Sequence, residues 1–227
     1  MADYVRKTIL SQGYAHIEGI KLTQQQKEDF EIAIAEYQKP RAKVLLGREI
    51  IPEVRTEDGS LKVYTTVYGS LSDALGNFDN FMVAVNSLYG SSKMLADACN
   101  LESLFISRAK KKALVRAEAR TGVVRATKDL FDRVAYLSEA RQQESNTKIA
   151  KNIADLDKKI VFLNDQLTYA RDKSLVWGNL IPLIKDFHSK VYKSQSTVND
   201  ERLKEHKEAI MHLVKDLENF ATQGDVD

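Results

Sequence analysis

The chain has few of the residues that cross-link a fold or end its helices: cysteine, proline and glycine. Its 227 residues include one cysteine, three prolines and ten glycines. A single cysteine excludes an intramolecular disulfide and a thiolate metal cluster, so the disulfide-rich secreted class of proteins is excluded. Most of the prolines and glycines precede residue 91, which leaves the C-terminal part free to form long helices.

Long apolar runs are also missing. No window approaches the roughly 18 apolar residues that a membrane-spanning helix needs. Residues 1–7, Met-Ala-Asp-Tyr-Val-Arg-Lys, lack the apolar region of a secretory signal. We therefore expect a cytoplasmic protein that can lie on a membrane surface without crossing it. The formal net charge is only +2, but the basic residues are unevenly distributed.

Patterns that indicate catalysis or metal binding are scarce. His206 and His212 are six residues apart and lack the intervening glutamate of a zinc-binding H-E-x-x-H helix. Neighbouring carboxylates such as Asp155 and Asp157 alternate with lysines, which is typical of a solvated helix face. The glycines form no phosphate-binding loop. The sequence thus predicts no enzyme activity, no catalytic residues, no metal, no cofactor and no small-molecule substrate.

The clearest pattern present is a heptad seam, an apolar stripe along one side of a helix. Its members are four, three, four, three and four residues apart: Ile149, Ile153, Leu156, Ile160, Leu163 and Leu167. Charged residues occupy the positions between them, so the stripe must pack on another helix of the same chain or of a second copy. The sequence predicts self-association through this seam, which would make a homo-oligomer.

Apolar residues spaced three and four apart in other segments predict a mainly α fold, a long antiparallel helical hairpin or coiled-coil bundle. Residues 94–141 are expected to form one long helix, and residues 138–147 the polar tip of the hairpin. Two segments with the alternating pattern of β-strands flank Asp58-Gly59, a pair suited to a tight turn. One small β-hairpin is therefore predicted near residues 50–68.

Three regions follow from these assignments. Residues 1–69 form an N-terminal arm with short helices and the β-hairpin, residues 70–222 a long-helix coiled-coil domain, and residues 223–227 a frayed tail. The first helix is predicted over residues 3–12 and ends at Gly13. The hairpin is expected to be a separable arm, because no other segment shows a convincing period-two pattern.

Residues 105–128 contain eight basic side chains and one acid, Glu118. On a helix, residues four apart share a face, so the expected long helix carries a cationic ridge that an anionic partner or the acids of a neighbouring helix could neutralise. The predicted anionic-surface residues are Arg108, Lys110, Lys111, Lys112, Arg116, Arg120 and Arg125. Phe105 is the sole aromatic residue in this segment, which favours a lipid surface over nucleic acid.

Residues 71–221 resemble the Bin/amphiphysin/Rvs (BAR) domains, which curve membranes. The resemblance rests on Leu-Tyr-Gly-Ser-Ser-Lys at 88–93, the basic segment 108–128, the polar tip and the interrupted final helices. It implies three long kinked helices that dimerise and present the basic residues to lipid headgroups. The sequence thus indicates a non-enzymatic helical scaffold; the alternative is a virion or other assembly subunit whose N-terminal arm clasps its neighbours.

Overall fold

The computed structural model describes residues 8–47, 50–57, 60–76, 80–140, 146–193 and 201–222. The chain divides into two compact units, residues 1–125 and residues 126–227. The first unit holds a four-stranded antiparallel sheet and its helices, and the second is helical. The predicted boundary after residue 69 lies inside the first unit, because strands on both sides of it pair in one sheet.

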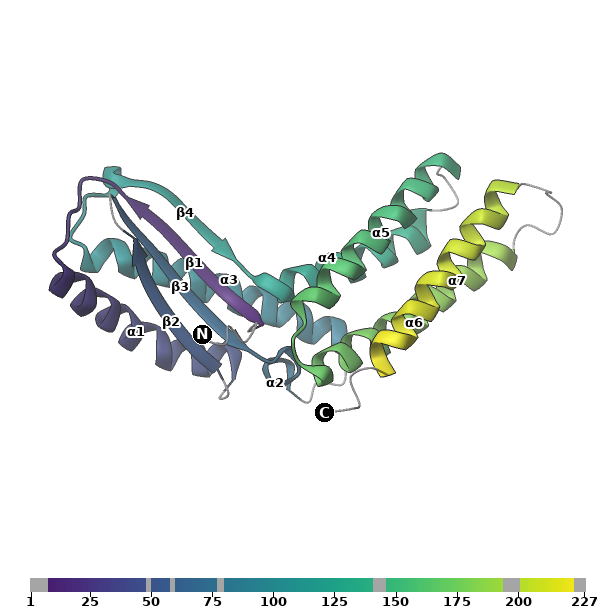
Figure 1. The fold of residues 1–227 in the computed structure, drawn as a ribbon, viewed down its shortest axis with the longest axis horizontal. Helices are drawn as coiled ribbons and strands as arrows, with labels where there is room; N and C mark the ends of the chain where they lie inside the picture. Colours follow the sequence, from purple (N-terminus) through teal and green to yellow (C-terminus); the bar gives the residue numbers. More distant parts are fainter. Residues whose placement is uncertain are drawn as a thin grey trace, which may run out of the picture. The chain divides into compact units, whose positions relative to one another are not determined.

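The first unit combines strands and helices. Its elements are β1 (Ile9–Ile17), α1 (Gln24–Leu46), β2 (Ile50–Glu57), β3 (Leu61–Gly69), α2 (Leu71–Leu75), α3 (Phe81–Ile106), a 3₁₀ turn (Lys111–Ala113) and β4 (Leu114–Arg120). The strand order is β2-β3-β1-β4 and every neighbouring pair is antiparallel (Figure 1). Hence β1 is parallel to β2, and β3 to β4, with helices in each connection. This is the split βαβ, or ferredoxin-like, connectivity.

The predicted hairpin exists, but it is not a separable arm. Strands β2 and β3 pair as expected, and β3 then continues the sheet by pairing with β1. Residues 9–12, predicted as helix, belong to β1. A lone two-stranded hairpin is marginal in water, and the additional strands supply the packed face that it needs.

The prediction of one helix over residues 94–141 is wrong. Helix α3 ends at Ile106, and Arg108 then takes a left-handed conformation with φ 54°, which a continuing helix cannot accommodate. Strand β4 follows, and α4 (Gly122–Ala140) begins only after it. The cationic helix face therefore does not exist, and the basic segment on which the BAR resemblance partly rests is mostly turn and strand.

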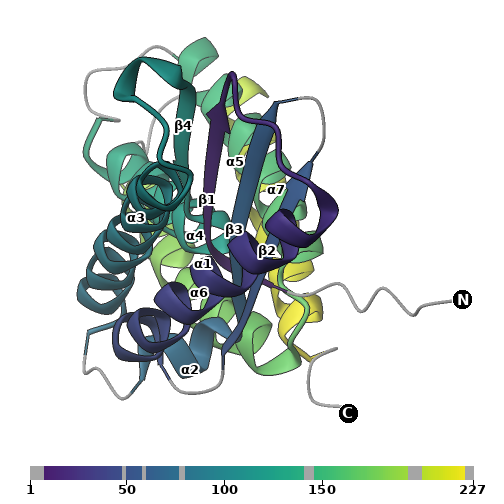
Figure 2. The same cartoon turned by 90° about the vertical axis from the view of Figure 1, so that its left-hand side faces the viewer.

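Helices α1 and α3 cover one face of the sheet (Figure 2). Core side chains between α1 and the sheet include Ile17, Phe30, Ile34 and Val63. A capping box begins α1: Thr23 Oγ1 accepts a hydrogen bond from the Gln26 amide, and the Gln26 side chain accepts one from the Thr23 amide. Among the described residues of this unit, no helix covers the other face of the sheet.

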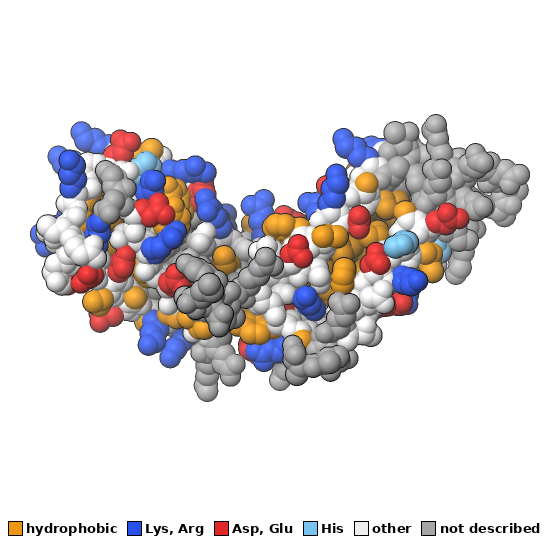
Figure 3. All heavy atoms as spheres, in the orientation of Figure 1, with side chains coloured by type: hydrophobic (Ala, Val, Ile, Leu, Met, Phe, Trp, Pro, Cys, Tyr) orange, Lys and Arg blue, Asp and Glu red, His pale blue; other side chains and the backbone are white. Residues whose placement is uncertain are grey.

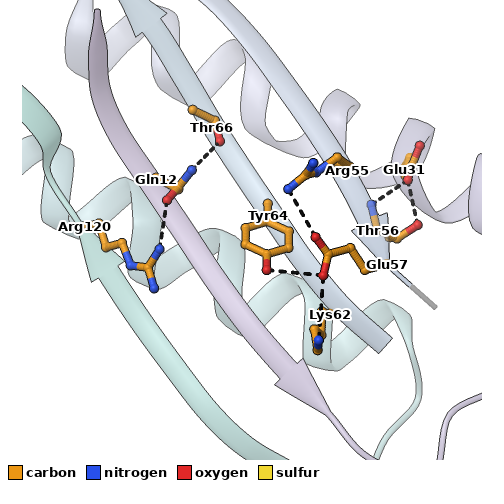
Figure 4. Close-up of polar contacts among 9 residues, drawn as sticks. All are labelled: Gln12, Glu31, Arg55, Thr56, Glu57, Lys62, Tyr64, Thr66 and Arg120. Carbon is orange, nitrogen blue, oxygen red and sulfur yellow. Dashed lines mark hydrogen bonds and ion pairs between the residues drawn. The ribbon is translucent and has the colours of Figure 1, made fainter. Parts of the chain in front are cut away.

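Edge strand β2 has two features that occupy its outer side. Pro52 has no backbone N–H to donate. Four residues on, the Thr56 amide and hydroxyl donate to Glu31 of α1 at 2.7 and 2.6 Å (Figure 4). The backbone nitrogens of residues 52 and 56 lie on the same side of the strand, because their spacing is even. Both therefore face outward, away from β3.

The second unit contains most of α4 together with α5 (Asn146–Gln166), α6 (Ala170–Lys193) and α7 (Glu201–Thr222). Helix α7 packs on both α5 and α6. Arg133 of α4 forms an ion pair with Asp155 of α5 at 3.2 Å. Trp177 is fully buried and its ring lies 6.4 Å from that of Phe220, so the tryptophan is a packing residue. None of the described helices is long and apolar enough to cross a membrane.

The heptad seam forms part of this unit's own core. Its members from Ile153 to Leu167 are all buried, whereas the side chain of Ile149 lies outside the described residues. The partner helices are in the same chain, so these buried members offer no exposed surface to a second copy. Self-association through the seam, as predicted, would require this core to open. Residues 141–145 of the predicted tip and the tail 223–227 lie outside the described residues.

Cys99 of α3 is fully buried, and burial raises the pKa of its thiol to about 11. The thiolate is the nucleophilic form, so we expect the native protein to react with a thiol reagent such as Ellman's reagent only on unfolding. Because the folded pKa is raised, the stability linked to this thiol is complete below the unfolded pKa and is lost as the pH rises toward 11. Rapid modification in native buffer at pH 8 would contradict this prediction.

Candidate functional site on the open face of the sheet

The sheet face opposite α1 and α3 carries a polar and aromatic surface. Alternate residues of a strand point to the same face, and directly paired residues share it. Strand β1 contributes Gln12, Tyr14 and His16; β3 contributes Lys62, Tyr64, Thr66 and Tyr68; β4 contributes Arg116, Glu118 and Arg120; and β2 contributes Glu53, Arg55 and Glu57. We call this surface the open face. Basic and acidic side chains intermingle there with hydrophobic ones (Figure 3).

Two tyrosines lie side by side at the centre of the open face. Tyr14 of β1 is directly opposite Tyr64 of β3, and their ring centroids are 5.0 Å apart with an interplanar angle of 45°. Aromatic pairs that only fill a core face a covering layer. Here α1 and α3 cover the other face, so the open face presents these rings away from the helical layer.

Arginines lie over both rings. The guanidinium carbons of Arg116 and Arg120 are 5.9 and 5.5 Å from the Tyr14 ring centroid, and that of Arg55 is 4.9 Å from the Tyr64 centroid. These are cation–π distances. Tyr14 is only 8% exposed, yet the side chains of Arg116 and Arg120 are 62% and 49% exposed. Exposed, flexible groups therefore lie over Tyr14 and can move aside.

Two carboxylates organise the basic side chains. Glu118 forms ion pairs with Arg116 and Arg120, and the Arg120 Nε donates to it at 2.7 Å. On the other side of the tyrosines, Glu57 pairs with Arg55 at 3.2 Å and with Lys62 at 3.7 Å (Figure 4). Each cluster pairs two cations with one anion, and exposed Glu53 of β2 lies on the same face two residues from Arg55.

The hydrogen bond from Arg120 lowers the pKa of Glu118 below its ordinary value, and Arg116 adds to this effect. A lowered carboxyl pKa keeps Glu118 ionised in mild acid. Its stabilising contribution is present above the unfolded pKa and is lost only as the pH falls through the lowered, folded value.

Further polar groups fix the side chains around the tyrosines. The Gln12 amide donates to Thr66 Oγ1 at 2.9 Å, and Arg120 donates to Gln12 Oε1 at 3.4 Å, which links three adjacent strands (Figure 4). His16 Nε2 lies 2.7 Å from Ser60 Oγ. Beyond Ser60 is a hollow of about 220 Å³, whose lining includes Lys21 and Lys27.

The structure separates the predicted anionic-surface residues. Arg116 and Arg120 lie together on the open face, because an even spacing keeps two strand residues on one side. Lys110, Lys111 and Lys112 are exposed at or beside the 3₁₀ turn that leads into β4. Arg108 lies in the turn after α3, and Arg125 is in α4. No group of three metal-binding side chains occurs among the described residues.

Sequence reasoning misses the aromatic half of this site. It places Tyr14 beyond a helix that ends at Gly13, and Tyr64 in an isolated hairpin. The signal that could have found β4 is the alternation of Arg116, Glu118 and Arg120 with Val115, Ala117 and Ala119. The strand has only seven residues, which is too short for its alternation to be recognised with certainty from the sequence.

Comparison with known proteins adds no family to this geometry: no protein-family model, curated protein or solved structure matches the chain.

Proposed function

We propose that the open face binds single-stranded nucleic acid, with two bases stacked on Tyr14 and Tyr64. The observation that carries this proposal is the tyrosine pair, opposite each other on adjacent strands with centroids 5.0 Å apart. Four-stranded sheets that present such aromatics are a common platform for unpaired bases, because every base has a π face. The connectivity alone would not support a function, since this fold serves many.

The basic side chains support the same proposal. Arg116 and Arg120 lie beside Tyr14, and Arg55 and Lys62 lie beside or near Tyr64. A phosphodiester backbone crossing the sheet would meet one cluster on each side of the bases. Its phosphates can take the place of Glu118 and Glu57 as partners of these cations, which releases counterions and makes binding salt-dependent.

A strand that leaves the platform past His16 reaches the hollow whose lining includes Lys21 and Lys27. The exposed lysines 110–112 precede β4 at the end of the sheet where Leu114 pairs with Ile17. The lysines 110–112 extend the positive surface beyond the tyrosines, and the hollow adds two lysines beside Glu57. The proposal keeps the non-enzymatic binding role expected from the sequence and changes the anionic partner from a membrane to nucleic acid.

The proposal is tested with fluorescein-labelled single strands of about 12 nucleotides, as RNA and as DNA, titrated with the full chain at low salt. Tyr14→Leu and Tyr64→Leu should each weaken binding about 5- to 150-fold, because base–aromatic stacking contributes about 1–3 kcal/mol per base. Tyr37→Leu is the matched control: Tyr37 also has an arginine, Arg41, 3.6 Å over its ring, but it lies on α1.

The charged groups give a second readout in the same assay. Arg116→Gln with Arg120→Gln should reduce the slope of log affinity against log salt by about 1.4, the value for two phosphate contacts. Glu118→Gln frees both arginines and should tighten binding. Anionic vesicles of phosphatidylserine serve as the competing partner. Arginine-dependent binding to vesicles without binding to either oligonucleotide would overturn the proposal in favour of lipid.

A further inference from the structure

We infer that the hollow beyond Ser60 binds the 3′-terminal ribose of a bound RNA strand through its free 2′,3′-diol. This inference rests on the proposed function and names the kind of strand end that the open face selects. The hollow measures about 220 Å³, below the range of about 300–1,000 Å³ that is usual for pockets holding a drug-sized ligand. It therefore accepts one sugar with its phosphate and excludes a longer segment.

Three segments form the walls of the hollow. They are the loop of residues 20–22 between β1 and α1, Lys27 of α1, and the hairpin residues Glu57, Ser60 and Leu61. The loop and the hairpin supply apolar surface for the carbon atoms of a sugar. Because walls from three segments surround the hollow, a strand that enters from the open face ends there.

The carboxylate of Glu57 is the group that selects a diol. Its Oε1 accepts from Arg55 at 3.2 Å, but the partners of Oε2 are more distant, the Tyr64 hydroxyl at 3.5 Å and Lys62 Nζ at 3.7 Å (Figure 4). A carboxylate can accept about four hydrogen bonds, and O–H donors approach an oxygen to about 2.5–3.0 Å. Glu57 thus has capacity for two hydroxyl donors, as the acidic residue that holds a ribose does in dinucleotide-binding proteins.

Ser60 supplies a second group for the diol. Its Oγ lies 2.7 Å from His16 Nε2. When the imidazole donates to Ser60, the serine hydroxyl can donate to a ligand, and when the imidazole accepts, the serine oxygen can accept from a ligand. A sugar hydroxyl both donates and accepts, so it fits either tautomer of His16.

A terminal phosphate suits the hollow less well than a diol. A phosphate monoester carries about two negative charges and would be repelled by Glu57, whereas a diol is neutral. Lys21 and Lys27 also line the hollow. They are suited to the phosphodiester that joins the last nucleotide to the rest of the strand.

The hollow lies one step beyond the tyrosine pair. Glu57 is directly opposite Lys62, which is two residues, or about 6.5–7 Å, from Tyr64 along β3. Through its contact with the Tyr64 hydroxyl, Glu57 belongs to both the open face and the hollow. The last nucleotide places its ribose in the hollow, and the two preceding bases stack on Tyr64 and Tyr14. The strand therefore runs 5′ to 3′ from Tyr14 toward the hairpin.

Binding of the full chain to RNA strands with different 3′ ends tests the inference. The strands have about 12 nucleotides, carry fluorescein at the 5′ end, and terminate in a diol, in a 2′-deoxyribose or in a 3′-phosphate. Loss of the terminal 2′-OH should weaken wild-type binding about 10- to 150-fold, the range for one hydrogen bond to a charged group. The 3′-phosphate should weaken it at least as much. A 2′-deoxyribose at the 5′ end is the control and should have no effect.

Variants of the hollow should remove the preference for the diol. Glu57→Gln should bring the affinities for the diol and the phosphate ends close together, and Ser60→Ala should reduce their ratio several-fold. The matched control is Glu53→Gln, which removes the same charge from the same face at an exposed position outside the lining of the hollow. It should keep the wild-type ratio, whatever it does to overall affinity.

The outcomes separate this inference from the proposed function. Equal wild-type affinity for the three ends would overturn the inference and leave the proposed function standing. Tighter binding of the 3′-phosphate would also overturn it, because the lysines would then bind the end of the strand. So would a diol preference that persists in Glu57→Gln. Failure of every strand to bind would overturn the proposed function and this inference with it.

Discussion

Replacing Leu156 and Leu163 of α5 together by aspartate should unfold the helical unit of residues 126–227. Both side chains are buried at 2% and 0% exposure. Each substitution removes about 1.5–3 kcal/mol of apolar burial and leaves an unpaired charge in the core. Losses above about 4 kcal/mol arise from such changes and approach the whole stability of a small domain.

Hydrogen exchange of the full chain, read by mass spectrometry, is the appropriate measurement. We expect α5, α6 and α7 to lose protection, while the sheet of the first unit keeps it, because the two units are separately compact. The control is Val161→Asp with Phe162→Asp on the same helix, at exposed positions, which should change the free energy of unfolding by less than about 1 kcal/mol. Unchanged helix protection in the buried double variant would contradict the assignment of the seam to this core.

A second large effect is expected at Gly13, in the middle of β1. An added Cβ would lie 2.4 Å from Thr65 Oγ1, 2.8 Å from Asn100 Oδ1 and 2.9 Å from the Ala96 carbonyl oxygen. The last contact is to the backbone of α3, which cannot rotate away. Gly13→Val must therefore push α3 off the sheet, and overpacking of this kind costs about 1–3 kcal/mol or more.

Denaturant unfolding of Gly13→Val, Gly13→Ala and Gly90→Ala would measure this effect. Gly90→Ala is the matched control, because it adds the same methyl group to a glycine of α3 that has open space around it, and it should stabilise the dilute protein by about 0.5–1 kcal/mol. If Gly13→Ala and Gly90→Ala changed the midpoint equally, close packing of β1 on α3 would not be what Gly13 provides.

Gly13 also shows where sequence reasoning failed. From its neighbouring residues alone, Gly13 was interpreted as the end of a short amphipathic helix. Its actual role is to let a helix more than 80 residues away approach the strand, and no local pattern encodes that approach. The apolar stripe of α5 was predicted correctly for the opposite reason, because its determinants lie within a few turns of one helix.

Strand β4 was missed for a different reason. The basic residues Lys112, Arg116 and Arg120 are spaced four apart. Four residues are close to one helical turn and also two strand periods, so this spacing fits both structures. What decides for the strand is pairing with β1, about 100 residues earlier. The same non-local pairing of strands brings Tyr14 to Tyr64, which is why the candidate site could not be assembled from the sequence.

The outer side of β2 bears on how copies of this chain can accumulate safely in a cell. An exposed strand edge is a template for runaway fibre growth, in which each added chain presents a fresh edge to the next. Pro52 has no N–H to donate to an added strand, and the Thr56 N–H already donates to Glu31. Ordered assembly through backbone pairing is thereby disfavoured at β2, and any assembly must use another surface, which closes into a finite particle when its symmetry closes.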